Sequence, residues 1–168
     1  MVLYEIDDGH LGMREILPVE SELLRMIPVW ADGETDDVEG RLFPSPATDE
    51  EEAELRADWQ AHVEPDLQEF FRSTRQIVEA DLRSMKKDED GFVVEFSLQH
   101  AEAWLNALGQ ARLALATRHG FEEKELSGLG PREIRTERDL ALFQIHFYEM
   151  IQHWLVEILD RREFGADS

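Results

Sequence analysis

The stretch "LNALGQARLALATRHG" (residues 105–120) predicts a single helix with small and aliphatic residues on almost every side. On one side of this helix, positions 98, 101, 105, 108, 112 and 115 are spaced three and four residues apart, as in the seam of a coiled coil. Five of these positions hold Leu or Ala, and the sixth holds Arg112. A guanidinium cannot lose its charge, so a buried Arg112 requires a carboxylate or several carbonyl groups as partners. Glu149 and Glu22 lie on helices expected to pack nearby, which makes them the candidate partners.

Three interpretations of Arg112 stay open at this stage. It is a paired core arginine that fixes the register of the helices, an anion or partner-peptide site facing a groove, or an ordinary exposed arginine. The first interpretation is favoured, because an unpaired charge in a buried seam would be strongly destabilising.

The segments on either side of this helix predict the rest of the fold. Short apolar runs at residues 2–6 and 11–17 flank an Asp-Gly turn, a pattern typical of a β-hairpin. Alternating apolar residues at 92–96 predict a further strand that completes a small antiparallel sheet with the hairpin. Residues 86–91, "KKDEDG", are expected to form a turn, and residues 121–133 a loop.

Apolar spacing predicts helices in four regions of the chain. The first starts at Pro18 and ends or bends at Pro28, and the second runs from about residue 49 to Met85 with a break near Pro65. The third covers 97–119 and ends before Gly120, and the last ends at Arg162. This last helix is the most apolar, so we expect it to be the central helix. The fold class is therefore mainly α: a bundle of about four to five helices with a small antiparallel β element formed by the N-terminal hairpin and residues 92–96.

Composition bounds the class of protein. The 168 residues fit one helical domain, 1–168, and a hydrophobic fraction of 42% supports a packed core. The absence of Cys excludes disulfides and thiolate chemistry. With 38 acidic residues against 17 Lys and Arg, the formal charge of −21 disfavours binding to nucleic acid or anionic membranes. The acidic N-terminal segment lacks the features of a signal peptide, so we expect a cytoplasmic protein without a membrane span.

The remaining candidate sites are a loop and a helix face. Residues 31–48 are predicted to form an acidic surface loop, interrupted by Leu42 and Phe43, which we expect either to anchor a partner protein or to pin the loop to the core. On the last helix, His146, Glu149 and His153 share one face, and with His100 they are the only candidates for a metal site. Their order reverses the Glu-before-His spacing of helical metal sites, so we expect neither a metal nor another cofactor.

Three segments, "ESELLRMI" (20–27), "RLFPSPATDEEEAELRADW" (41–59) and "WLNALGQARLALATRHG" (104–120), resemble a family of bacterial proteins classed as a domain of unknown function. The resemblance covers roughly residues 15–160. Members are chiefly actinobacterial, are often encoded beside an adaptor of the Clp protease, and in some cases are labelled transcriptional regulators. The family pattern is matched by Arg41 and Leu42 in the loop and by Arg112, Leu113 and Arg118 in the helix.

This chain departs from the family pattern in three positions. Gly109 and Gln110 replace a common Asn-Asp pair, and Ala116 replaces a common Gly. The resemblance implies no activity, cofactor or catalytic residue, and the regulator label conflicts with the acidic charge. It does make Arg41 and Arg118, with Arg112, candidates for structural or anion-binding roles.

The sequence contains no nucleophile elbow and no phosphate-binding glycine motif. It therefore favours a non-enzymatic protein-interaction or regulatory module, with a link to protein turnover suggested by the resemblance. The alternative is a metal-binding protein or small enzyme that uses the His146, Glu149 and His153 face, and a transcriptional regulator is the least favoured reading. A protein partner and a homodimer are both compatible with the sequence.

Overall fold

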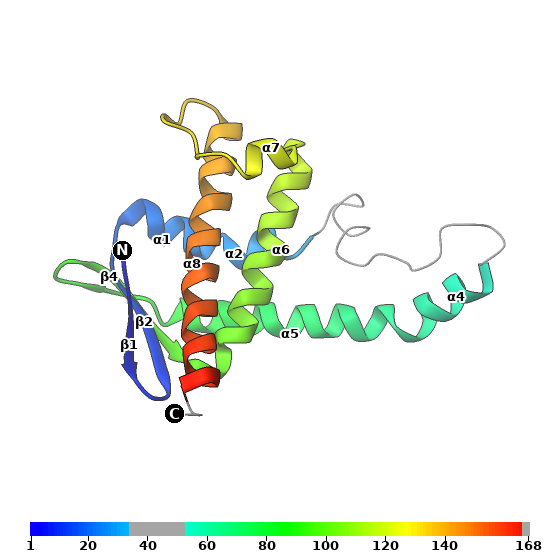
Figure 1. Ribbon diagram of the computed structural model, residues 1–168, viewed down its shortest axis with the longest axis horizontal. Helices are drawn as coiled ribbons and strands as arrows, with labels where there is room; N and C mark the ends of the chain where they lie inside the picture. Colours follow the sequence, from blue (N-terminus) through cyan, green and yellow to red (C-terminus); the bar gives the residue numbers. More distant parts are fainter. Residues whose placement is uncertain (34–52, 166–168) are drawn as a thin grey trace.

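A small antiparallel sheet and a group of helices make up the fold (Figure 1). The computed structural model describes residues 1–33 and 53–165. The sheet has the strand order β1-β2-β4-β3, with β1 at Val2–Asp7, β2 at His10–Ile16, β3 at Lys86–Asp88 and β4 at Gly91–Ser97. The predicted hairpin and its pairing with residues 92–96 are confirmed, since Leu11 pairs with Phe96 and Met13 with Val94. The mainly α fold class with a small β element is confirmed as well.

The edge strand β3 was not expected, because residues 86–91 were predicted to be a turn throughout. Only Glu89 and Asp90 form the turn, and Lys86–Asp88 pair with β4. All three residues of β3 are exposed, so the segment has no buried face. Apolar alternation therefore cannot predict this strand. Its charged residues are typical of an edge strand, because charges discourage pairing with the strand of another chain.

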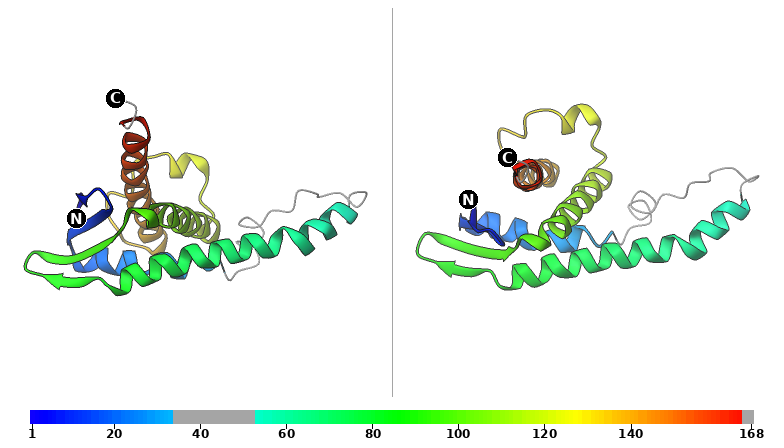
Figure 2. Two further views of the ribbon diagram at one scale, coloured as in Figure 1. Left: turned by 90° about the horizontal axis from the view of Figure 1, so that it is seen from below. Right: turned by 60° about the horizontal axis from the view of Figure 1, so that its bottom comes forward.

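Prolines divide the helical regions as expected. The first region splits into α1, Pro18–Arg25, and α2, Ile27–Trp30, with Pro28 in the first turn of α2. The second splits into α4, Ala53–His62, and α5, Glu64–Arg83, with Pro65 in the first turn of α5. Proline is tolerated there because the first N–H groups of a helix have no partner within it. Together, α4 and the first turns of α5 extend beyond the other helices (Figures 1 and 2).

The centre of the molecule is α6, Ala101–His119, and not the last helix as predicted. A short 3-10 turn, η2 at Leu98–His100, leads into α6, and Ser97 caps this turn by accepting a hydrogen bond from the Gln99 N–H. Neighbouring helices α2, α5 and α8 pack against different sides of α6. Small side chains allow this close approach on several sides; the buried alanines of α6 are Ala101, Ala103, Ala107, Ala111 and Ala114. Gly120 ends the helix with a φ of 62°, as expected for a left-handed cap.

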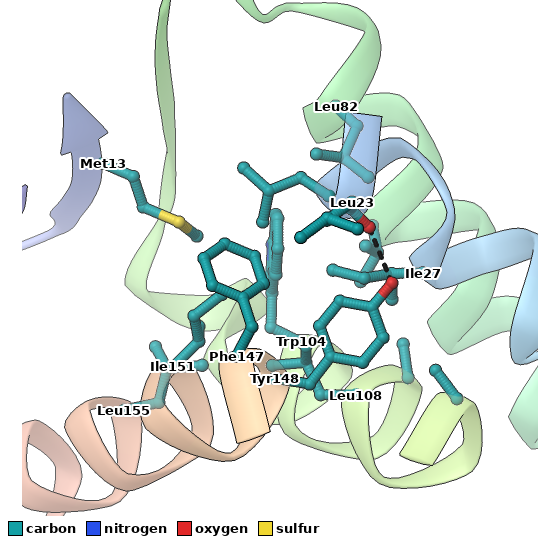
Figure 3. Close-up of a cluster of buried hydrophobic side chains, with 14 of the residues drawn as sticks. Met13, Leu23, Ile27, Leu82, Trp104, Leu108, Phe147, Tyr148, Ile151 and Leu155 are labelled. Carbon is teal, nitrogen blue, oxygen red and sulfur yellow. Dashed lines mark hydrogen bonds between the residues drawn. The ribbon is translucent and has the colours of Figure 1, made fainter. Parts of the chain in front are cut away.

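The last helix, α8 at Glu137–Gly165, runs beside α6 and is preceded by the short α7, Glu123–Leu126 (Figure 1). The loop predicted for 121–133 thus contains a helical turn, stabilised where the Glu125 carboxylate accepts a hydrogen bond from the Glu122 N–H. The core lies between α6, α8, α1 and the sheet. There Trp104 stacks on Phe96 at 4.7 Å between ring centroids, and Phe147 and Tyr148 of α8 point into the same cluster (Figure 3). None of the described helices has an apolar stretch long enough to cross a membrane.

Candidate functional site

The arginine of the α6 seam meets a carboxylate and an amide of α8. Arg112 Nη1 donates to Gln152 Oε1 at 2.7 Å, and Nη2 lies 3.3 Å from Glu149 Oε1. Gln152 in turn donates to the backbone carbonyl of Leu105 at 3.0 Å, so its amide bridges Arg112 and the backbone of α6. Of the two candidate partners, Glu149 is therefore the one that pairs with Arg112. Glu22 is exposed and pairs with Arg25 on its own helix at 2.8 Å.

Arg112 is half-buried rather than fully buried in the seam. Its side chain is 31% exposed, and that of Glu149 is 50% exposed. Water therefore screens the ion pair, which is worth much less than a pair sealed in the core. The Nε atom of Arg112 is buried and has no hydrogen-bond partner among the described residues.

His146 extends the same network along α8. Its Nδ1 lies 3.4 Å from Glu149 Oε2, so the Glu149 carboxylate stands between the histidine and Arg112. The ring is covered by the loop before α8, because a Cβ on Gly130 would lie only 3.2 Å from His146 Cδ2. We call these four residues the α6–α8 polar cluster: Arg112, His146, Glu149 and Gln152.

The metal candidates do not converge. His153 is exposed and pairs with Glu157 at 3.2 Å, whereas His146 pairs with Glu149. His100 belongs to a different contact, 3.0 Å from the Asp81 carboxylate. Among residues 1–33 and 53–165, no group of three or more His, Asp or Glu side chains is arranged to hold a metal ion. The geometry therefore gives no support to a metal centre on this face.

Asp81 is a contact residue that the sequence analysis missed. Its carboxylate accepts hydrogen bonds from Trp104 Nε1 at 2.9 Å and from the His100 ring at 3.0 Å. These bonds tie α5 to the start of α6. The only signal in the sequence was an acidic residue beside the buried positions Val78 and Leu82, and such residues are common on helices.

Of the other predicted site residues, Arg118 lies within the described part of the chain, and the candidates in the acidic loop do not. Arg118 is exposed and lies over the Trp30 ring, 5.5 Å from its centroid, which is a cation–π contact between α6 and α2. Arg41, Leu42 and Phe43 lie outside the described residues, as does most of the predicted acidic loop.

An apolar stripe runs along a third side of α8. It comprises Leu140, Phe143, Phe147, Met150 and Trp154, spaced three, four, three and four residues apart. Phe147 is buried, but Phe143 is 36% and Met150 46% exposed, and Leu140 is exposed to a similar extent. Leu140 and Phe143 therefore lie outside the buried core. The ring of Phe143 lies instead over the edge of the core, parallel to Phe147 at 6.5 Å.

One exposed leucine adjoins this stripe. The side chain of Leu129 is 99% exposed, and it stands between two glycines in the loop before α8. Its neighbour Gly130 contacts His146, which lies between Phe143 and Met150 on the helix surface because residues three and four apart are neighbours. We call the exposed members of this surface the α8 patch: Leu129, Leu140, Phe143 and Met150.

Comparison with known proteins assigns a family but no activity. No curated protein and no solved structure matches the chain. A family described as a domain of unknown function, DUF2017, matches residues 13–159. This match spans most of the chain and includes both the α6–α8 polar cluster and the α8 patch. The protein therefore belongs to the DUF2017 family.

Proposed function

We propose that this protein is a non-enzymatic protein-interaction module that binds its partner through the α8 patch. The observation that carries the proposal is the exposure of heptad-spaced apolar side chains on α8 beside Leu129, whose side chain is almost fully exposed. Apolar side chains that gather on one surface are typical of interaction sites, and aromatic and Met side chains concentrate binding energy there.

The polar cluster supports this function by holding the patch in place. Arg112 and Gln152 tie α8 to α6, and Glu149 ties His146 to the same network. Because Gly130 rests on the His146 ring, the position of Leu129 depends on this network. A rigid surface loses less conformational entropy when it binds a partner.

Site-specific photo-crosslinking in the producing cells tests the proposal. A photoreactive phenylalanine at position 150 should capture a defined protein, whereas the same residue at position 156 should not. Val156 is a matched control, since it is 42% exposed on the same helix and lies outside the stripe. Equal capture from both positions, or capture from neither, would contradict the proposal.

The identity of the captured protein also tests the link to protein turnover. That link is a proposal based on the resemblance to proteins encoded beside a Clp adaptor. Reproducible absence of Clp components from the crosslinked material would remove it and leave the interaction site in place.

A further inference from the structure

We propose that the occupant of the α8 patch is a basic amphipathic helix of a partner protein. This inference rests on the proposed function and specifies the chemistry of the partner. The spacing of the apolar side chains, the charges around them and the repulsion between two copies of this chain all favour such a helix.

The spacing of the stripe fits a helix. The intervals of three, four, three and four residues from Leu140 to Trp154 cover two heptads, which is the pattern that a second helix packs against. At 1.5 Å per residue, these 14 steps extend over about 21 Å. A partner helix of about 15 residues with apolar side chains at the same intervals therefore matches the stripe in length and period.

The charges on α8 favour a basic partner. Between Asp139 and Asp160 the helix contains no Lys or Arg, and it carries two further acids, Glu149 and Glu157. Both side chains are at least half exposed. Of these two acids, Glu149 pairs with Arg112, which approaches it from the α6 side.

Basic residues at the two ends of α8 are engaged elsewhere. Arg138 pairs with Glu125, and Arg161 and Arg162 both pair with Glu5. Arg132 and Arg135 lie in the loop beside Leu129, where Arg135 pairs with Glu133. The helix surface beside the stripe is thus acidic along its length, and Lys or Arg on a partner helix would complement it.

A second copy of this chain fits the stripe less well. Pairing two α8 stripes would bring Glu149 and Glu157 of each copy toward the acidic side of the other, and each chain has a formal charge of −21. Like charges across an interface oppose association. A partner helix with the opposite charge removes this repulsion.

A displayed library of 18-residue helical peptides tests the inference on the full-length protein. Each peptide has Leu, Ile or Phe at heptad spacing, and its flanking positions are drawn from Lys, Arg, Asp, Glu, Gln and Ala. We expect the enriched peptides to carry a net positive charge. Enrichment of neutral or acidic peptides, or no enrichment, would overturn the inference.

Variants of two kinds separate the patch from general attraction to an acidic protein: apolar-to-Gln variants, which keep the net charge, and one variant that removes two acids beside the stripe. The enriched peptides should bind at least tenfold more weakly to the double variant Phe143→Gln/Met150→Gln, and with unchanged affinity to Val156→Gln. Glu157→Gln/Asp160→Asn should weaken binding several-fold. Circular dichroism and thermal melting check that each variant is folded. Equal binding of the peptides to all these variants would show attraction without a site and would overturn the inference.

Two further outcomes distinguish this inference from the proposed function. A concentration-dependent dimer, seen by light scattering and lost in Phe143→Gln/Met150→Gln, would make a second copy the occupant. If position 150 captures a protein in cells but no basic helix is enriched, the proposed function stands and the inference fails.

Discussion

At the scale of single residues, a buried hydrogen-bond chain joins α8 to α1. The Tyr148 hydroxyl donates to the Leu23 carbonyl at 2.6 Å (Figure 3). It also accepts a hydrogen bond from Gln144 Nε2 at 2.6 Å. Tyr148 is fully buried, and this burial raises the pKa of its hydroxyl. The hydroxyl therefore stays protonated and keeps its donor role.

Replacing Tyr148 with Phe should lower the free energy of unfolding by about 1–3 kcal/mol, because the Leu23 carbonyl and the Gln144 amide lose a buried partner. Urea denaturation measures the effect. Tyr4 is the only other tyrosine, and its hydroxyl bonds the exposed Glu95. Tyr4→Phe should therefore cost much less, and equal losses for the two variants would contradict the explanation.

Replacing Arg112 with Ala should cost about 1–2 kcal/mol, since it removes the hydrogen bond to Gln152 and a partly screened ion pair to Glu149. A loss of about 3–5 kcal/mol, as for a sealed pair, is not expected at this exposure. Arg83→Ala is the control, because its pair with Glu79 on the surface of α5 is well exposed and should contribute little. Urea denaturation measures the free energy of unfolding of both variants. A similar loss of stability in the two would contradict a stabilising role for the α6–α8 polar cluster.

Heptad spacing defines a side of a helix, so the sequence could place Arg112 on the side of α6 that packs against another helix. It could not choose between Glu149 and Glu22. That choice depends on how α1 packs on the core. Leu23 and Leu24 of α1 are buried in the core, and this packing leaves Glu22 exposed.

At the scale of elements, a reciprocal cap starts α8. The Asp139 carboxylate accepts from the Arg135 and Thr136 N–H groups at 3.1 and 3.0 Å, and the Thr136 hydroxyl accepts from the Asp139 N–H at 3.1 Å. This arrangement is a capping box. The hydrogen bonds, first from Arg135 and then from Thr136, lower the pKa of Asp139.

The lowered pKa of Asp139 makes stability depend on acid pH. The folded state holds the proton less tightly than the unfolded state, so this stabilisation is present above the unfolded pKa, near 3.8, and is lost as pH falls through the folded pKa. Asp139→Asn should therefore flatten the decline of stability below about pH 4. Thermal melts from pH 2 to 7 measure this decline in Asp139→Asn and in the original protein, with Asp160→Asn as the charge-matched control. An unchanged acid decline in Asp139→Asn would refute this role.

Element prediction succeeded where local signals were strong. The Asp-Gly turn, the two prolines and Gly120 each dictate backbone geometry, so the hairpin, the helix breaks and the end of α6 were foreseen. It failed on α8, where apolar residues occur on nearly every side and periodicity cannot say which of them face the core. The α8 patch was missed for this reason, since the positions of α6 and the sheet determine that Phe147 is buried and Phe143 is exposed.

At the scale of the whole molecule, α8 uses three of its sides differently. One side builds the core through Tyr148, Ile151 and Leu155, and the side facing α6 holds the polar cluster. The third side carries the stripe. Since one rigid helix bears all three, loss of the polar cluster should affect binding through the position of the loop at Gly130 as well as through stability.

The charge of the whole molecule leads to a prediction about salt. Folding brings 38 acidic residues together with only 17 Lys and Arg, and this net charge of −21 destabilises the compact state by self-repulsion. Raising NaCl from 0.01 to 0.1 M shortens the Debye length from about 30 to about 10 Å, so most of the long-range repulsion is screened. Surface ion pairs are screened too, but each contributes little.

Stability should therefore increase with salt, by about 1 kcal/mol, or about 2–4 °C in melting temperature for a chain of this length. Thermal melts at fixed pH in NaCl and KCl measure the change, and agreement between the two salts separates screening from binding of a specific cation. The repulsion arises between acids spread over the whole surface, so neutralising one of them, as in Glu157→Gln, should give only a fraction of the salt effect. A melting temperature that falls with salt would mean that local ion pairs, such as those of Glu5 with Arg161 and Arg162, outweigh the net charge.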